Sequence, residues 1–141
     1  MEAGNRGVGP VGSGPRLMPA TAFDRRLDLL ESSGQVSPQA RRLTMELVER
    51  VERAFGLSLD EANGAMLVTH LALSLSRLEG GAVDVEAPDP VREEMEGRRR
   101  ELTFMRSELA ACGDALGRPI PEAEVLYMTA HLCVVLEQVG S

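Results

Sequence analysis

Aromatic side chains are nearly absent from this chain of 141 residues, and their scarcity strongly limits how it can fold. Phe, Tyr and Trp together make up 3% of the residues and Trp does not occur, whereas 43% of the residues are hydrophobic. The core must therefore be built from Leu, Val, Ala and Met side chains. This composition favours packed helices over a sandwich or barrel, and the length suits a single domain.

The first twenty residues differ in composition from the rest of the chain. Residues 1–20 are rich in Gly and Pro and have no periodic apolar positions, so they bury too little apolar surface to offset the entropy of ordering. The sequence predicts a disordered segment over 1–20 and a single helical domain over 21–141. Met18 lies just before the first periodic segment, and translation from Met18 is an alternative interpretation of the start.

Periodic apolar positions and capping residues predict five helices. The clearest start is Ser37-Pro38, where a serine N-cap precedes a proline at the first helical position. Two prolines make residues 81–90 a predicted loop. The five helices are expected to begin near Thr21, Ser37, Ser58 or Asp60, Val91 and Pro121, and to end near Gly34, Gly56, Gly80, Leu116 and Glu137. Together they predict an all-α, compact five-helix bundle.

The charge distribution argues against direct binding of nucleic acid. The net charge is −7, and all fifteen basic residues are Arg. The run Arg98 to Arg100 lies among glutamates, which predicts a solvated helix face with i,i+4 pairing rather than a phosphate-binding patch.

Apolar runs and cysteine spacing indicate a cytoplasmic protein without a membrane partner. No apolar run approaches the ~18–20 residues that a bilayer span needs, and the N-terminus lacks the apolar core of a signal peptide. Cys112 and Cys133 fall within helical patterns and not in a C-x-x-C motif. Reduced, buried thiols are therefore expected, with a disulfide as the alternative.

The two histidines, His70 and His131, lie in similar Ala/Leu/Val helical patterns. On a helix His70 shares a face with Arg77, and His131 shares one with Tyr127 and Glu124. Such companions can orient an imidazole and leave one ring nitrogen free as base, ligand or nucleophile. The pattern alone nevertheless favours half-buried histidines, each with one satisfied hydrogen bond.

Other kinds of site lack a motif in this sequence. A metal needs three or four ligands, and the two histidines, Cys133 and scattered glutamates have neither HExxH nor Cys-pair spacing. No G-x-S-x-G motif or Gly-rich phosphate loop occurs. The sequence predicts no metal, no cofactor and no enzymatic activity. A small helical enzyme that uses His131 and Glu124 as acid and base is a further class, without a substrate-binding motif to support it.

Three segments resemble the family of PTS regulation domains (PRDs). "IPEAEVLYMTAHL" (120–132) is similar to the family segment in which I-P-E-x-E leads through a Tyr to a His on the last helix. "MLVTHLALSLSRLEGG" (66–81) resembles the family's first-histidine segment, and "RLDLLESSGQVSP" (26–38) its opening helix and turn. The resemblance covers about residues 23–137.

The resemblance implies a usually dimeric bundle of five helices that senses the phosphoenolpyruvate-dependent sugar phosphotransferase system (PTS). The family's phosphorylatable positions map onto His70 and His131, with Arg77, Glu124 and Tyr127 as supporting side chains. The implied partners are PTS phosphocarrier proteins, a second copy of the chain, and a regulatory protein through which a lone domain acts in transcription regulation of carbohydrate metabolism. The alternative is a helical dimerisation or interaction module that is not phosphorylated.

The sequence departs from the family pattern beside each histidine. Thr69 stands where many members have Asp, so the usual acidic partner of the His70 imidazole is missing. Leu126 stands where Gly commonly precedes the Tyr, and its side chain is expected to narrow access to His131.

The charged neighbours of the two histidines suggest a switching hypothesis. A phosphoryl group adds roughly −1.5 to −2 charges, which Glu124 would repel and Arg77 would attract. Phosphorylation at His131 and at His70 would then bias a dimer interface in opposite directions.

Overall fold

The computed structural model describes residues 22–81 and 86–139, which form six α-helices. The expected all-α class is confirmed, with one helix more than the sequence predicts. The predictions of disorder over 1–20 and of a start at Met18 lie outside the described residues, as does part of the predicted loop, 82–85. The helices are α1 (Asp24–Ser32), α2 (Pro38–Phe55), α3 (Glu61–Glu79), α4 (Asp89–Glu96), α5 (Arg99–Leu116) and α6 (Glu122–Val139).

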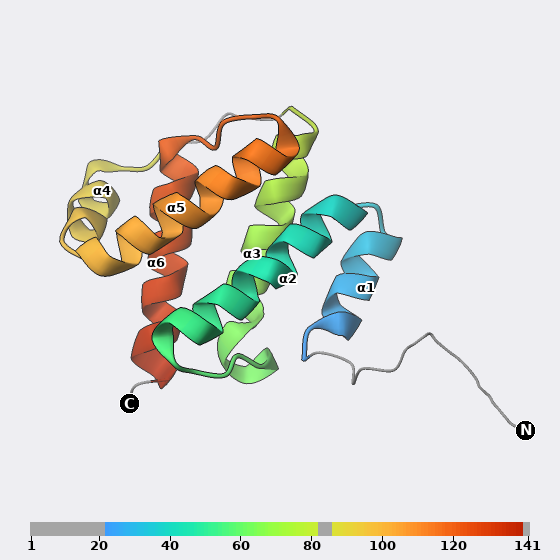
Figure 1. Cartoon of the computed structure of the whole chain (residues 1–141), viewed down its shortest axis with the longest axis horizontal. Helices are drawn as coiled ribbons and strands as arrows, with labels where there is room; N and C mark the ends of the chain where they lie inside the picture. The colour runs from blue at the N-terminus through green and yellow to red at the C-terminus, as the bar shows by residue number, and fades with distance from the viewer. Residues whose placement is uncertain (1–21, 82–85, 140–141) are drawn as a thin grey trace, which may run out of the picture.

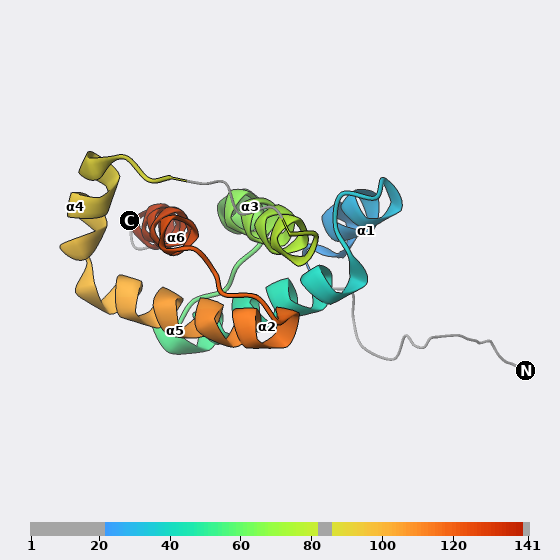
Figure 2. The same ribbon diagram turned by 90° about the horizontal axis from the view of Figure 1, so that it is seen from above.

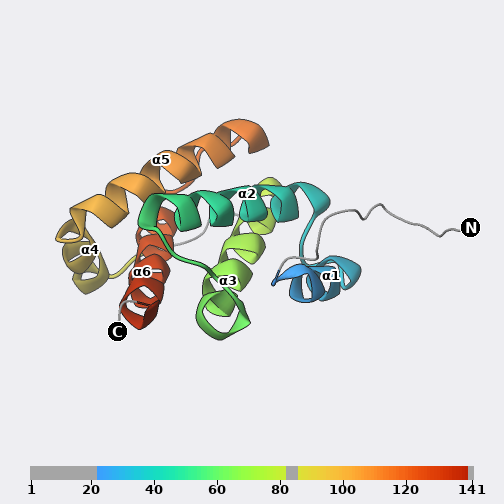
Figure 3. The same cartoon turned by 60° about the horizontal axis from the view of Figure 1, so that its bottom comes forward.

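The helices lie in two layers. α3 and α6 lie side by side and antiparallel (Figure 1), with α1 and α4 at the two flanks of the pair (Figure 2). α2 and α5 lie across the same side of α3 and α6 (Figure 3). One side of the α3–α6 pair therefore packs into the bundle, and no described helix lies over the opposite side (Figure 2).

Local capping explains where α2 and α3 begin. The Ser37 hydroxyl accepts a hydrogen bond from the Ala40 amide at 3.0 Å, and a proline follows directly in the first turn. Asp60 caps α3, and the Asn63 side chain completes a capping box by accepting from the Asp60 amide. Both predicted starts are confirmed. The helices begin at these positions because each capping side chain accepts hydrogen bonds from amides that the first helical turn leaves unpaired. Gly56 ends α2 at φ +66°, in the left-handed region.

The single helix predicted from Val91 to Leu116 is wrong, because the chain breaks between α4 and α5. Gly97 ends α4, and Arg98 has φ −103° and ψ 65°, outside the helical region. Glycine inside a helix costs about 1 kcal/mol relative to alanine. The turn also lets Met95 and Leu102 both be buried, although they belong to helices that run in different directions (Figure 2).

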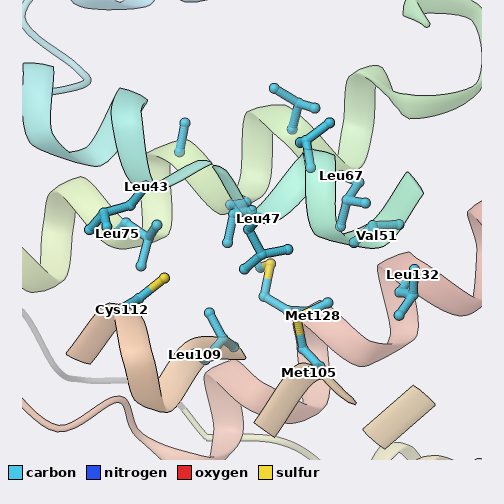
Figure 4. Close-up of a cluster of buried hydrophobic side chains, with 14 of the residues drawn as sticks. Leu43, Leu47, Val51, Leu67, Leu75, Met105, Leu109, Cys112, Met128 and Leu132 are labelled. Atoms are coloured by element: carbon cyan, nitrogen blue, oxygen red, sulfur yellow. The ribbon is translucent and has the colours of Figure 1, made fainter. Parts of the chain in front are cut away.

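The core is aliphatic, as the composition requires. Side chains from α2, α3, α5 and α6 converge in one cluster, shown in Figure 4. Among the described residues, Phe23 is the one buried aromatic. The labelled members of the cluster are Leu43, Leu47, Val51, Leu67, Leu75, Met105, Leu109, Cys112, Met128 and Leu132.

Arg99 and Arg100 of the arginine run are exposed, as a solvated helix face requires, and side chains of the run also tie α5 to its neighbours. Arg98 pairs with Glu101 in the next turn and with Glu137 on α6. Arg100 lies over the Phe55 ring at 4.4 Å and donates to the Ala54 carbonyl at 3.1 Å. Two of the three guanidinium groups in the run, those of Arg98 and Arg100, therefore contact another helix.

Gly113, in the last turns of α5, allows the segment between α5 and α6 to lie directly against the helix. A Cβ at this position would lie 2.7 Å from the Arg118 carbonyl oxygen and 3.3 Å from Cγ1 of Ile120. The first distance is below van der Waals contact with a backbone atom, which a rotamer change cannot relieve. The close packing of the α5–α6 connection against α5 therefore requires glycine at position 113.

We expect Gly113→Ala to lower the free energy of unfolding by about 1–3 kcal/mol, as overpacking of a core does. Urea unfolding followed by circular dichroism measures the change. Gly80→Ala is the matched control, since a Cβ there would meet its nearest atom at an ordinary 3.5 Å. Equal stability of the Gly113→Ala and Gly80→Ala proteins would show that the connection is not held by this close approach.

Candidate functional site

His70 of α3 and His131 of α6 stack against each other across the two helices. Their ring centroids are 4.4 Å apart and the ring planes differ by 17°. His70 is exposed and His131 is half-buried. Two histidines separated by 61 positions in the sequence thus form one site, which the linear pattern does not reveal.

The imidazoles lack the hydrogen bonds that the pattern alone predicts for them. Within residues 22–81 and 86–139, neither ring makes a hydrogen bond or an ion pair with the protein. A histidine that serves as a structural core residue usually has a satisfied ring nitrogen. The described contacts therefore occupy none of the four ring nitrogens.

The surroundings of His131 lower its pKa below the ordinary value of 6.5. Burial disfavours the charged imidazolium, and the neighbouring charge of His70 acts in the same direction. Neutral imidazole, which has a free lone pair, is therefore the dominant form at neutral pH. Because the unfolded chain takes up this proton more readily than the folded one, His131 reduces stability as the pH falls below about 6.5.

Arg77 and Glu124, which the sequence associates with different histidines, form a pair with each other. The Arg77 Nη2 lies 3.6 Å from Glu124 Oε2, and the Ser74 hydroxyl donates to Glu124 Oε1 at 2.5 Å. Glu124 is only 5% exposed. Arg77 and Glu124 each lie two turns from the histidine on their own helix. The switching hypothesis needs a positive charge beside His70 and a negative charge beside His131, and pairing of Arg77 with Glu124 removes that difference.

Tyr127, one turn before His131, donates its phenol hydrogen to the Glu86 carbonyl at 3.2 Å. The phenol thus holds the backbone just before α4, and it makes no hydrogen bond to either imidazole in the described structure. Leu126 is fully buried in the core. It lies about 140° around α6 from His131, so its side chain does not cover the imidazole as the sequence suggested.

Ser74 and Arg26 are polar residues of this region that sequence reasoning missed. A serine inside the apolar stripe of a helix requires a hydrogen-bond partner when it is buried. The position of Ser74 in the sequence could therefore have indicated a buried polar contact. Arg26 of α1 donates to the Thr69 hydroxyl at 3.2 Å and pairs with Glu61 at 2.7 Å. No local pattern links α1 to the residue before His70, and only the fold brings them together.

The two cysteines are poor competitors for nucleophilic chemistry. Cys112 and Cys133 are both buried and unbonded, as expected for reduced thiols. Burial raises the pKa of each thiol to about 11, which keeps the reactive thiolate scarce at neutral pH. No group of three or more His, Cys, Asp or Glu in the described part of the chain could hold a metal ion.

The family model described as PRD domain matches residues 45–133, from the third turn of α2 to the last turns of α6. The match covers more than half of the chain and includes both histidines. The chain therefore belongs to the PRD family, and it is a module of PTS-linked regulation. The expected family membership is confirmed. Comparison with curated proteins and with solved structures found no significant match.

The stack predicts how the pKa of His131 responds to loss of its neighbour. In His70→Ala the pKa of His131 should rise toward 6.5, because the repulsion from a second imidazolium is removed and water reaches the ring more easily. NMR titration of the imidazole protons measures it. In Glu122→Ala, which leaves both rings in place, the pKa should match that of the wild type. An unchanged pKa in His70→Ala would mean that the rings do not interact in solution.

Glu124 and Glu122, in the same first turn of α6, provide a matched pair of variants. Glu124→Ala removes a buried carboxylate bonded to Ser74 and should lower the free energy of unfolding by about 1–3 kcal/mol. Glu122→Ala removes an exposed ion pair with Arg106 and should cost less than about 1 kcal/mol. Thermal or urea unfolding gives both values. The reverse order would contradict a structural role for the buried carboxylate.

Proposed function

We propose that this PRD accepts phosphoryl groups on His70 and His131 from PTS phosphocarrier proteins and passes that state to a regulatory protein partner. The observation that carries the proposal is the stacked imidazole pair, whose rings have no hydrogen bond to the described protein and of which His70 is exposed and His131 half-buried. The partner would act in the control of carbohydrate utilisation.

The chemistry needs little from the acceptor beyond a neutral, reachable imidazole. The lone pair of a ring nitrogen attacks the phosphorus of a phosphohistidine on the donor, and a new N–P bond forms as the donor's N–P bond breaks. The electron pair of the broken bond returns to the donor imidazole, which takes up a proton, and the acceptor ring releases the proton of its other nitrogen. No oxidant, metal or cofactor is consumed. The lowered pKa of His131 favours the neutral, nucleophilic form at neutral pH.

Apolar side chains beside the histidines support contact with another protein. Met66 lies one turn before His70 and is 63% exposed, and Val134 lies one turn after His131 and is 53% exposed. Because α3 and α6 are antiparallel, both side chains lie on the same side of the histidine pair. In this proposal the protein is a cytoplasmic homodimer that uses this surface, has no catalytic turnover of its own and binds no nucleic acid directly. None of the described helices is long and apolar enough to cross a membrane.

The same exposed residues fit a second candidate, a helical dimerisation or interaction module that is never phosphorylated. Such a module would use Met66 and Val134 in the same way but would leave both imidazoles unmodified.

Phosphorylation in vitro separates the two candidates. The wild type, incubated with phosphoenolpyruvate and the general PTS proteins, should gain an acid-labile phosphoryl group detectable by intact mass. The double variant His70→Ala/His131→Ala should gain none, whereas Glu122→Ala, which alters the same helix away from the rings, should behave as the wild type. A wild type that gains no phosphoryl group under any condition would leave the unphosphorylated module as the function.

A further inference from the structure

We infer that the stacked pair His70 and His131 is a single acceptor site, in which a phosphoryl group on one histidine excludes a second group on the other. The inference rests on the proposed function and concerns its regulation. The domain would then exist in two states, unmodified or carrying one phosphoryl group, and would never carry two phosphoryl groups.

The first argument is the separation of the rings. The centroids are 4.4 Å apart and the planes are nearly parallel. A phosphoryl group bonded to a ring nitrogen lies in the plane of that ring. Two such groups would occupy adjacent, nearly parallel planes. Each group would carry roughly −1.5 to −2 charges at neutral pH. The 4.4 Å between the ring centroids is shorter than the Debye length of about 8 Å at physiological ionic strength, so salt screens poorly the repulsion between charges carried on the two rings.

The second argument is that the neighbouring cations are already engaged. Arg77 faces the buried carboxylate of Glu124, and Arg26 is held by the carboxylate of Glu61 and by the Thr69 hydroxyl. In residues 22–81 and 86–139, no guanidinium contacts either imidazole. A second phosphoryl group would therefore find both of these guanidinium groups already paired with carboxylates.

The third argument concerns the reactivity of the remaining imidazole. A new negative charge against its ring stabilises the protonated form of that imidazole. For His131 this is the reverse of the pKa-lowering effect that His70 has on it before modification. Protonation occupies the lone pair needed to attack a second donor. The first transfer therefore weakens the nucleophile for the second.

The packing of α3 on α6 limits how far the rings can separate. The hydrogen bond from Ser74 to Glu124 fixes the two helices next to the histidine pair, and buried leucines of both helices join the common core. Relief of the repulsion would require a ring to leave the stack for another rotamer, and helix geometry restricts the choice of rotamers.

The experiment counts phosphoryl groups per chain under exhaustive phosphorylation. The wild type, His70→Ala and His131→Ala are incubated with excess phosphoenolpyruvate and the general PTS proteins until the intact mass stops changing. We expect one group in each of the three proteins. Fragmentation of the wild type should locate the group on His70 in some molecules and on His131 in others, never on both. His70→Asn and His131→Asn repeat the test with side chains that keep a polar group at each position.

The possible outcomes separate the inference from the proposed function. Two groups per wild-type chain would overturn the inference and leave the proposed function intact. Phosphorylation of only one of the two single-site variants would also overturn it, since the limit would then reflect one unreactive histidine. The absence of any phosphoryl group in all proteins would overturn the proposed function itself.

Discussion

The antiparallel packing of α3 on α6 decides where the functional side chains lie. His70 and Arg77 are seven residues apart on α3, and Glu124 and His131 are seven apart on α6. Because the two spacings are equal, one alignment of the antiparallel helices brings both pairs together. It places His70 against His131 and Arg77 against Glu124. A shift by one turn would separate the rings and leave a buried carboxylate without its partners, which is costly. The buried Glu124 thus specifies the register that also creates the histidine stack.

Much of the fold could be predicted because its signals are local. A serine before a proline, an aspartate with an asparagine three residues on, and a glycine after an apolar stripe each satisfy or end a helix within one turn. The break at Gly97 was missed because an isolated glycine inside a polar helix pattern is often tolerated. In the structure the break accompanies the burial of both Met95 and Leu102 in the common core. That burial is a property of the whole bundle.

The candidate site could be predicted only in part. The sequence indicated the two histidines and the polar residues near them, but a helical face shows which residues can meet along one helix, not across two. Arg77 was therefore associated with His70, although its partner is Glu124 of α6. Thr69 shows the same limit. Its hydroxyl has a partner in Arg26 of α1, and α1 lies outside the residues that match the family.

The scarcity of aromatic residues gives the site an optical label of its own. The chain contains one Tyr and no Trp, and that Tyr lies one helical turn from His131. Its phenol hydrogen-bonds to the backbone just before α4, so its emission depends on the contact between that segment and α6. Near-ultraviolet fluorescence of the whole protein therefore comes almost entirely from one position beside the imidazole pair. A change of state there can be followed in real time, in the unlabelled protein, without a mutation.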